Sequence, residues 1–161
     1  MRRIAEPNPD GFDDALGFNL YRVALLFRRE LMQALAEYEL TPEQWQVMQS
    51  LWSTDEDLNQ SDVGQLTLRE KHTVSRILSR LERDGWIRKE PDPTDGRAHI
   101  IVPTEKANAL REEVRSTLFG YFEGIYEVPD EEEEEELMRL LKKLRRHLSD
   151  RPMIEEGASE D

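Results

Sequence analysis

Basic and hydroxyl side chains gather in one short stretch of this chain, residues 70–83. Val74, Ile77, Leu78 and Leu81 recur there at positions i, i+3, i+4 and i+7, which predicts an amphipathic helix with one apolar face. The other positions carry groups that bond phosphate oxygens and base edges, and the major groove of B-DNA admits one α-helix. The stretch therefore predicts a DNA-reading helix. Its candidate DNA contacts are Lys71, His72, Thr73, Ser75, Arg76 and Arg80.

A β-hairpin is predicted directly after this helix. The runs 86–90 and 98–102 are rich in β-forming residues, and the segment PDPTDG between them has turn chemistry. Arg97, near the tip of this stiff arm, can enter the minor groove of DNA, where the phosphate potential is focused. Asp95 is expected to pair with the Arg97 guanidinium and orient it, because a bidentate pair has a fixed geometry. Arg88 is a further candidate DNA contact.

Short helices are predicted before the basic helix. Thr41 and Gln44 fit a capping box that starts a helix running through residue 52. Ser61 is expected to cap a third helix with Val63 and Leu66 facing inward, and it is also a candidate DNA contact. The order of short helix, tight turn, basic helix and hairpin is that of a winged helix-turn-helix.

Longer helices are predicted at the two ends of the chain. The helix from residue 13 carries two apolar stripes, so it has two surfaces to bury, one of them against a second subunit. Gly85 is expected to end the basic helix in the left-handed conformation, and Thr104 to cap a long helix after the hairpin. Asp130 starts a last helix whose leucines have heptad-like spacing.

The charge of the chain is distributed unevenly. The whole chain of 161 residues has a formal charge of −13, whereas residues 60–106 sum to +1, so a polyanion would bind in that middle third. The absence of cysteine excludes disulfides, thiol catalysis and cysteine-bound zinc. No apolar run approaches a membrane span and the N-terminus lacks a secretory signal, so we expect a cytoplasmic protein with no membrane partner.

The sequence contains no pattern typical of a metal site or of an enzyme's catalytic residues. His72, His99 and His147 do not have metal-ligand spacing, and no nucleophile–base pair or phosphate loop is present, so we predict neither a metal site, nor a cofactor, nor an enzyme. Three aromatic residues have two interpretations: they belong to the core, or they line a ligand cavity where the first, second and fifth helices meet. These candidates are Tyr21, Trp45 and Trp52.

The residues 73–87, TVSRILSRLERDGWI, followed by DPTDGR at 92–97, resemble the multiple-antibiotic-resistance regulator (MarR) family. The positions in register are Thr73, Val74, Ser75, Arg76, Leu81, Gly85, Asp92, Pro93, Asp95, Arg97 and Thr104. The resemblance implies a homodimer with interlocked first and last helices that binds pseudo-palindromic operators in double-stranded DNA, usually as a repressor. It also implies a small aromatic or anionic effector bound between the dimer and DNA-binding lobes.

The chain departs from the family pattern at several positions. Gly96 stands near the wing tip where the family often has a second arginine, and Pro103 precedes Thr104 where leucine is usual. Arg69 replaces an apolar residue in the turn before the basic helix, so we expect Leu66 and Leu68 to fill that turn.

We therefore predict a mainly α protein with a winged helix-turn-helix lobe at about 41–104 and dimerisation helices at about 13–38 and 105–148. A flexible arm at 1–12 and a disordered tail at 149–161 complete the chain. The predicted function is a sequence-specific, ligand-responsive transcriptional regulator. The alternative is a winged-helix protein–protein interaction module that does not bind DNA, suggested by the acidic surface and the run of glutamates at 131–136.

Overall fold

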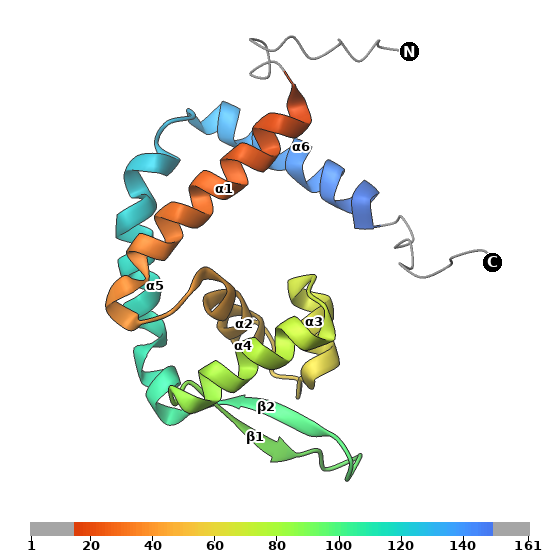
Figure 1. Ribbon diagram of the computed structural model, residues 1–161. Coiled ribbons are helices and arrows are strands. Elements are labelled where there is room, and N and C mark those ends of the chain that lie inside the picture. The colour runs from red at the N-terminus through yellow and green to blue at the C-terminus, as the bar shows by residue number, and fades with distance from the viewer. Residues whose placement is uncertain (1–14, 150–161) are drawn as a thin grey trace, which may run out of the picture. The chain divides into compact units, whose positions relative to one another are not determined.

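The computed structural model describes residues 15–149, so the predicted arm and the tail beyond Ser149 lie outside it. The described chain is mainly helical with one small sheet, and it divides into a unit up to Tyr121 and a second unit from Phe122. The predicted fold class is confirmed (Figure 1). Its elements are α1 (Leu16–Ala34), η2 (Ala36–Tyr38), α2 (Pro42–Trp52), α3 (Gln60–Thr67), α4 (Lys71–Arg83), β1 (Ile87–Pro91), β2 (His99–Pro103), α5 (Glu105–Tyr126) and α6 (Glu131–Ser149).

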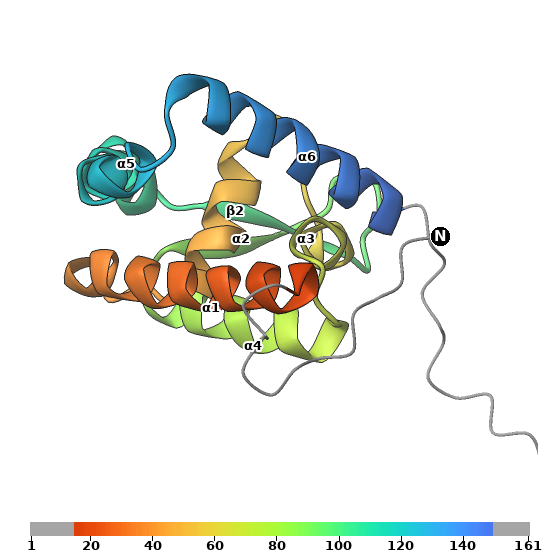
Figure 2. The same ribbon diagram turned by 90° about the horizontal axis from the view of Figure 1, so that it is seen from above.

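The helices α2, α3 and α4 pack with the β1–β2 hairpin into a winged lobe. The two strands are antiparallel, with Arg88 opposite Val102, and the hairpin extends away from the helices (Figure 1). In the view from above, the hairpin overlaps α2 and α3 (Figure 2). The amide of Ile101 also donates a hydrogen bond to the Leu58 carbonyl at 2.8 Å, which attaches the wing to the segment before α3. The fully buried side chains of the lobe are Val47, Met48, Val63, Val74, Leu78, Leu81 and Ile87.

Local capping signals start the first two helices of the lobe. The predicted capping box of α2 is confirmed, because Thr41 Oγ1 accepts from the Gln44 amide and the Gln44 side chain accepts from the Thr41 amide. The predicted cap of α3 is wrong: Asn59, not Ser61, is the N-cap, and its side chain accepts from the Ser61 and Asp62 amides. Asparagine is among the best N-cap residues, so α3 starts earlier than predicted.

The basic helix α4 ends as predicted. Gly85 adopts φ +75°, its amide donates to the Glu82 carbonyl, and the Trp86 amide donates to the Leu81 carbonyl at 2.8 Å. These bonds form a Schellman motif, which satisfies the last carbonyls of the helix. They turn the chain directly into β1, so the end of α4 determines where the wing begins.

The turn between α3 and α4 differs from the prediction. Leu66 and Leu68 do not fill it, because their side chains are 54% and 91% exposed. Arg69 turns inward instead, and its guanidinium donates a hydrogen bond to the Gln46 side chain at 3.0 Å. The long stem of an arginine can be buried while its head finds a polar partner, and this leaves the leucines outside.

The helices α1 and α5 frame the lobe. Thr104 caps α5 as predicted: its hydroxyl accepts from the Ala107 amide and donates to the Gly85 carbonyl at 2.7 Å. The Tyr38 and Thr117 hydroxyls are hydrogen-bonded at 2.8 Å, which ties the segment after α1 to α5. Much of the apolar surface of α1 is exposed, including Tyr21 at 69%.

The second unit contains α6. Asp130 and Glu133 form a reciprocal cap, in which each side chain accepts from the amide of the other residue. Four of the leucines of α6 are exposed and Leu144 is half-buried; the exposed ones are Leu137, Leu140, Leu141 and Leu148. Glu136 pairs with Arg139 one turn later. Within residues 15–149, no helix is long and apolar enough to cross a membrane.

Candidate nucleic-acid interface

The exposed side of α4 forms a continuous polar and basic face. Its apolar side is fixed in the core, where Val74, Leu78 and Leu81 are inaccessible to solvent. This burial fixes the rotation of the helix about its axis, so the opposite face must point outward. The predicted DNA contacts Lys71, His72, Arg76 and Arg80 are exposed, and Thr73 and Ser75 are half-buried at the edges of that face.

The cations of the lobe fall into two groups. Lys71, Arg76, Arg80 and Arg97 form no ion pair with any residue that the structure describes. Other basic side chains have carboxylate partners: Arg83 with Asp84, Arg88 with Glu90, and Lys89 with Glu82. The first group can meet phosphates without first breaking an internal pair.

The start of α4 is joined to α3. The Gln60 side chain donates to the Lys71 carbonyl at 3.2 Å, and the neighbouring Ser61 is exposed in the first turn of α3. His72 Nδ1 lies 3.4 Å from a Glu70 carboxylate oxygen. Ser61 is thus free of a capping role, and its hydroxyl is accessible on the helix next to α4.

The wing tip is ordered by its own aspartates. Asp92 accepts hydrogen bonds from the amide and the hydroxyl of Thr94, and these bonds keep the pKa of Asp92 below its ordinary value. The predicted pairing of Asp95 with the Arg97 guanidinium is not present. Asp95 accepts instead from the backbone amide of Arg97 at 3.0 Å, so it shapes the turn and does not pair with the guanidinium.

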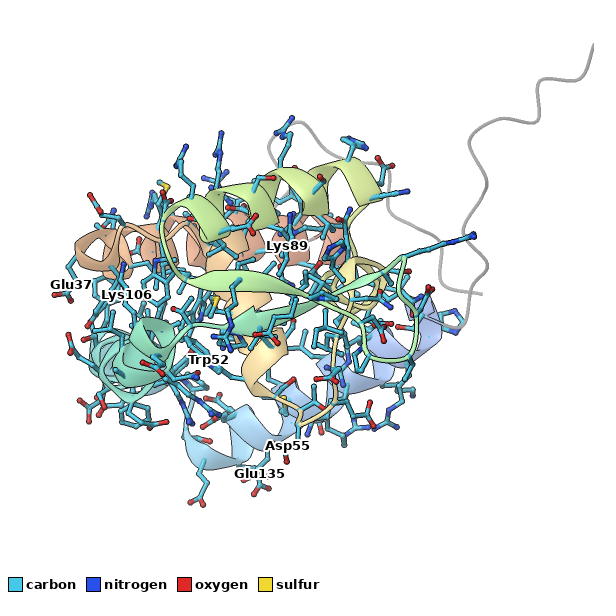
Figure 3. The ribbon with its side chains drawn as sticks, turned by 90° about the horizontal axis from the view of Figure 1, so that it is seen from below. Glu37, Trp52, Asp55, Lys89, Lys106 and Glu135 are labelled. Atoms are coloured by element: carbon cyan, nitrogen blue, oxygen red, sulfur yellow. The ribbon has the colours of Figure 1, made fainter. Side chains whose placement is uncertain are left out.

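Arg88 forms an ion pair within the wing that the sequence did not predict. Its Nε donates to Glu90 Oε1 at 2.5 Å, and the two side chains are on the same face of β1, two residues apart. A phosphate contact by Arg88 would compete with this pair. Lys89, labelled in Figure 3, projects from the other side of the strand, where its partner is Glu82 of α4.

A polar cluster connects α1 to the helix-turn-helix, and sequence reasoning missed it. Arg28 of α1 binds Glu43 of α2 through two hydrogen bonds, at 2.7 and 3.1 Å. Burial raises the pKa of Glu43, but the bonds from Arg28 and the nearby charge of Arg69 outweigh it, so the pKa lies below its usual value. Arg28 and Glu43 are 15 positions apart in the sequence, across a helix end and a turn, so no regular spacing indicated this pair.

An open cavity of about 300 Å³ lies against α2 and α5; Trp52, one of its lining residues, is labelled in Figure 3. Trp45 and Trp52 pack edge-to-face at 5.8 Å, and the guanidinium of Arg111 lies 5.8 Å from the centre of the Trp52 ring. Arg111 Nε is buried and has no hydrogen-bond partner among the described residues. The cavity is lined by Trp45, Gln49, Trp52, Ser53, Arg111 and Arg115.

This arrangement corrects the predicted grouping of aromatic residues. Trp45 and Trp52 line one cavity, but Tyr21 is not among its lining residues, and α1 contributes none. No sequence pattern indicated Arg111 and Arg115, because they are about 60 residues away from the tryptophans. Their spacing of four on one helix places both guanidinium groups on the same face. In the described part of the chain, no cluster of three or more metal-ligating side chains is present.

Comparisons with known proteins agree with this geometry. Residues 38–98 match the family model of the MarR family. The HTH-type transcriptional regulator TtmR of Methylorubrum extorquens (strain PA1) is 32% identical over 111 residues, which cover 69% of this chain and 56% of TtmR. The chain thus spans a little over half the length of that relative.

Solved structures have the same fold. A Pseudomonas aeruginosa protein described as a probable transcriptional regulator aligns with a TM-score of 0.74 at 26% identity, over 82% of this chain and 98% of that one. The transcriptional repressor CouR bound to a 23-mer DNA duplex gives a TM-score of 0.78 at 21% identity, over 88% and 99%. CouR from Rhodococcus jostii RHA1 bound to p-coumaroyl-CoA gives 0.75 at 19% identity, over 89% and 98%.

The family match covers the polar face of α4, the turn before it and the wing up to Ala98. The fold match extends over most of the described helices. The resemblance carried by the residues 73–87 and 92–97 is therefore confirmed: residues 38–98 of the chain match the MarR family, and a curated relative is an HTH-type transcriptional regulator.

Proposed function

We propose that this protein is a sequence-specific regulator of transcription that binds double-stranded DNA through α4 and the wing. The observation that carries the proposal is the exposed face of α4. Lys71, Arg76 and Arg80 have no ion-pair partner within residues 15–149, and the buried face prevents rotation of the helix. In this proposal Arg76 contacts base edges and Arg80 and Lys71 contact phosphates. Arg97 enters the neighbouring minor groove.

The remaining predicted contacts complete the interface. His72, Thr73 and Ser75 add hydrogen-bond donors and acceptors around the first turns of α4, and Ser61 contacts the backbone from α3. Asp95 acts indirectly, since it holds the amide of Arg97 and so shapes the wing tip. Genomic DNA as partner places the proposed action in the cytoplasm.

We also propose that the protein acts as a homodimer. The motivation is the exposed apolar surface of α1, where Leu16 and Val23 are more than 60% exposed, together with the exposed leucines of α6. Two-fold symmetry would place two copies of α4 in major grooves about one turn apart, roughly 34 Å. Light scattering at micromolar concentration tests this directly, because a monodisperse monomer contradicts it.

An effector site is the finer part of the proposal. The cavity against α2 and α5 offers two tryptophan rings and two guanidinium groups, which suit an aromatic or anionic small molecule. Both guanidinium groups lie near the Glu112 carboxylate, Arg111 Nε at 3.8 Å and Arg115 at 3.2 Å, so an anion would compete with this carboxylate. CouR has been solved with p-coumaroyl-CoA, an aromatic and anionic compound. Aromatic acids that raise the melting temperature of the wild type but not of Arg115→Ala would support this site.

The central experiment is selection of bound DNA from a random pool. A palindromic motif would support the regulator and the dimer together, and repression would then be tested on a reporter carrying that motif. Failure of the dimer to shift any DNA at low salt would contradict the proposal. That result would favour the alternative, a winged-helix module that binds another protein.

A further inference from the structure

The helix α3 ends with Leu68 in the left-handed region of backbone space, at φ 54° and ψ 46°. Its amide donates to the Gln65 carbonyl at 3.3 Å, and the Arg69 amide donates to the Gly64 carbonyl at 3.0 Å. The same pair of bonds ends α4, but there the left-handed position is occupied by Gly85. The same backbone motif thus ends both helices, with glycine in the left-handed position after α4 and leucine in that position after α3.

Nothing inside the described chain accounts for this leucine. A residue with a Cβ atom is disfavoured in the left-handed conformation, and glycine or asparagine would serve the backbone better. Burial does not compensate, because Leu68 is 91% exposed, more than any other large apolar residue that the structure describes. A strained backbone position with an apolar side chain directed into solvent points to a role outside the molecule.

The turn is built to hold Leu68 in place. A Cβ atom on Gly64 would lie 3.1 Å from the Arg69 carbonyl oxygen, so the two chain segments approach closely. The inward Arg69 side chain is fixed by its bond to Gln46. Leu68 is also two residues before Glu70, the N-cap of α4, and the N-terminal end of a recognition helix is the end that contacts base edges.

We propose that Leu68 is a specificity-determining residue that packs against the C5-methyl group of a thymine in the major groove. The proposal rests on the proposed DNA-binding function. That methyl group is the apolar feature of the major-groove edge, and it distinguishes A·T from the other base pairs. Removing one methyl group from a buried apolar contact corresponds to about a fourfold loss in affinity. The preference for thymine is therefore modest and confined to one position in each half-site.

The test uses the full-length protein and the DNA selected from a random pool. Each thymine of the half-site is replaced in turn by deoxyuridine, which lacks only the methyl group, and affinity is measured for the wild type, Leu68→Ala and Leu68→Gly. The wild type is expected to lose about fourfold at one thymine. Both variants should bind thymine and uracil equally well at that position. Leu66→Ala, which changes an exposed leucine in helical conformation on α3, is the matched control and should keep the wild-type profile.

Stability provides a second readout. Because glycine is unstrained at positive φ, Leu68→Gly should melt at or above the wild-type temperature while losing the preference for thymine. Identical thymine and uracil profiles for the wild type and Leu68→Ala would overturn the inference and leave DNA binding intact. A change in oligomeric state in place of the thymine preference would also overturn it. If the wild type selects no DNA, the proposed function fails as well, and the two failures are thus distinguishable.

Discussion

At the scale of single residues, the structure distinguishes basic side chains that are free to contact DNA from those already paired with a carboxylate. Arg76 and Arg88 are both exposed arginines of the lobe, but among the described residues only Arg88 has a carboxylate partner, Glu90. An exposed ion pair contributes little to stability, yet a phosphate must displace the carboxylate before it gains the full attraction of Arg88. The two arginines should therefore contribute unequally to DNA binding.

Arg76→Ala is expected to weaken binding to the selected DNA by about 1–3 kcal/mol and to relax its preference at one base pair, because a bidentate base contact is lost. Arg88→Ala should weaken binding less and equally on all sequences. Fluorescence anisotropy on the selected site and on a scrambled site measures both effects. Equal losses of DNA affinity for the two variants would show that the Arg88–Glu90 pair does not reduce the contribution of Arg88 to DNA binding.

At the scale of elements, the end of α4 decides how the wing leaves the lobe. Gly85 has φ +75°, and a Cβ atom there would meet no atom within 4 Å, so only the backbone conformation opposes a side chain. Gly85→Ala is expected to lower the free energy of unfolding by about 1 kcal/mol. Gly96→Ala in the wing is the control, since Gly96 has open space and no positive φ, and it should be neutral in the same urea titration.

The Arg28–Glu43 pair joins α1 to α2, and its contribution should depend on pH. The pKa of Glu43 is lower in the folded protein than in the unfolded chain, so the stabilisation is fully present above the unfolded pKa of about 4.5. It is lost as the pH falls through the folded pKa. Glu43→Gln should therefore lower the melting temperature near pH 7, and the difference from the wild type should shrink toward pH 3.

The control for this pH series is Glu136→Gln, which removes a comparable but exposed pair with Arg139 within α6. Its melting temperature should stay close to that of the wild type at neutral pH, because exposed pairs contribute little. A Glu43→Gln curve parallel to the wild type at every pH would show that Glu43 does not carry this pH dependence.

At the scale of the whole molecule, a nearly neutral middle segment belongs to a strongly acidic chain. Residues 60–106 sum to +1, whereas the whole chain carries −13. Counterion release should make DNA affinity fall with added salt, but repulsion from the acidic residues is less screened at low salt and opposes approach. The slope of log affinity against log salt should therefore flatten below about 0.05 M.

Neutralising acids of α6, which lie outside the winged lobe in the sequence, tests this balance. Glu132→Gln combined with Glu134→Gln should raise nonspecific DNA affinity at low salt and change it little at physiological salt, where the Debye length is about 8 Å. Nonspecific affinity is measured by anisotropy on a scrambled duplex over a salt series. Unchanged affinity at every salt concentration would mean that the acidic residues are electrostatically irrelevant to DNA binding.

Local signals explain why much of the winged lobe was predictable. The capping box at Thr41, the left-handed Gly85 and the Thr104 cap each depend on residues within a few positions, so they can be recognised from spacing. The apolar period of α4 likewise assigned its buried and exposed faces. The failure at α3 was also local, because Asn59 competes with Ser61 for the same cap and the better acceptor position came two residues earlier.

The sequence by itself determined the order of the helices, the hairpin and the basic face of α4, because periodicity and caps act between neighbours along the chain. Only the tertiary structure decided which polar groups meet. Arg28 binds Glu43 across a helix end, and Arg69 turns inward and binds Gln46. Arg111 donates a hydrogen bond to the carbonyl of Trp52, which is 59 residues away in the sequence. Such contacts depend on how elements pack in three dimensions, and packing leaves no regular spacing in the sequence to predict them.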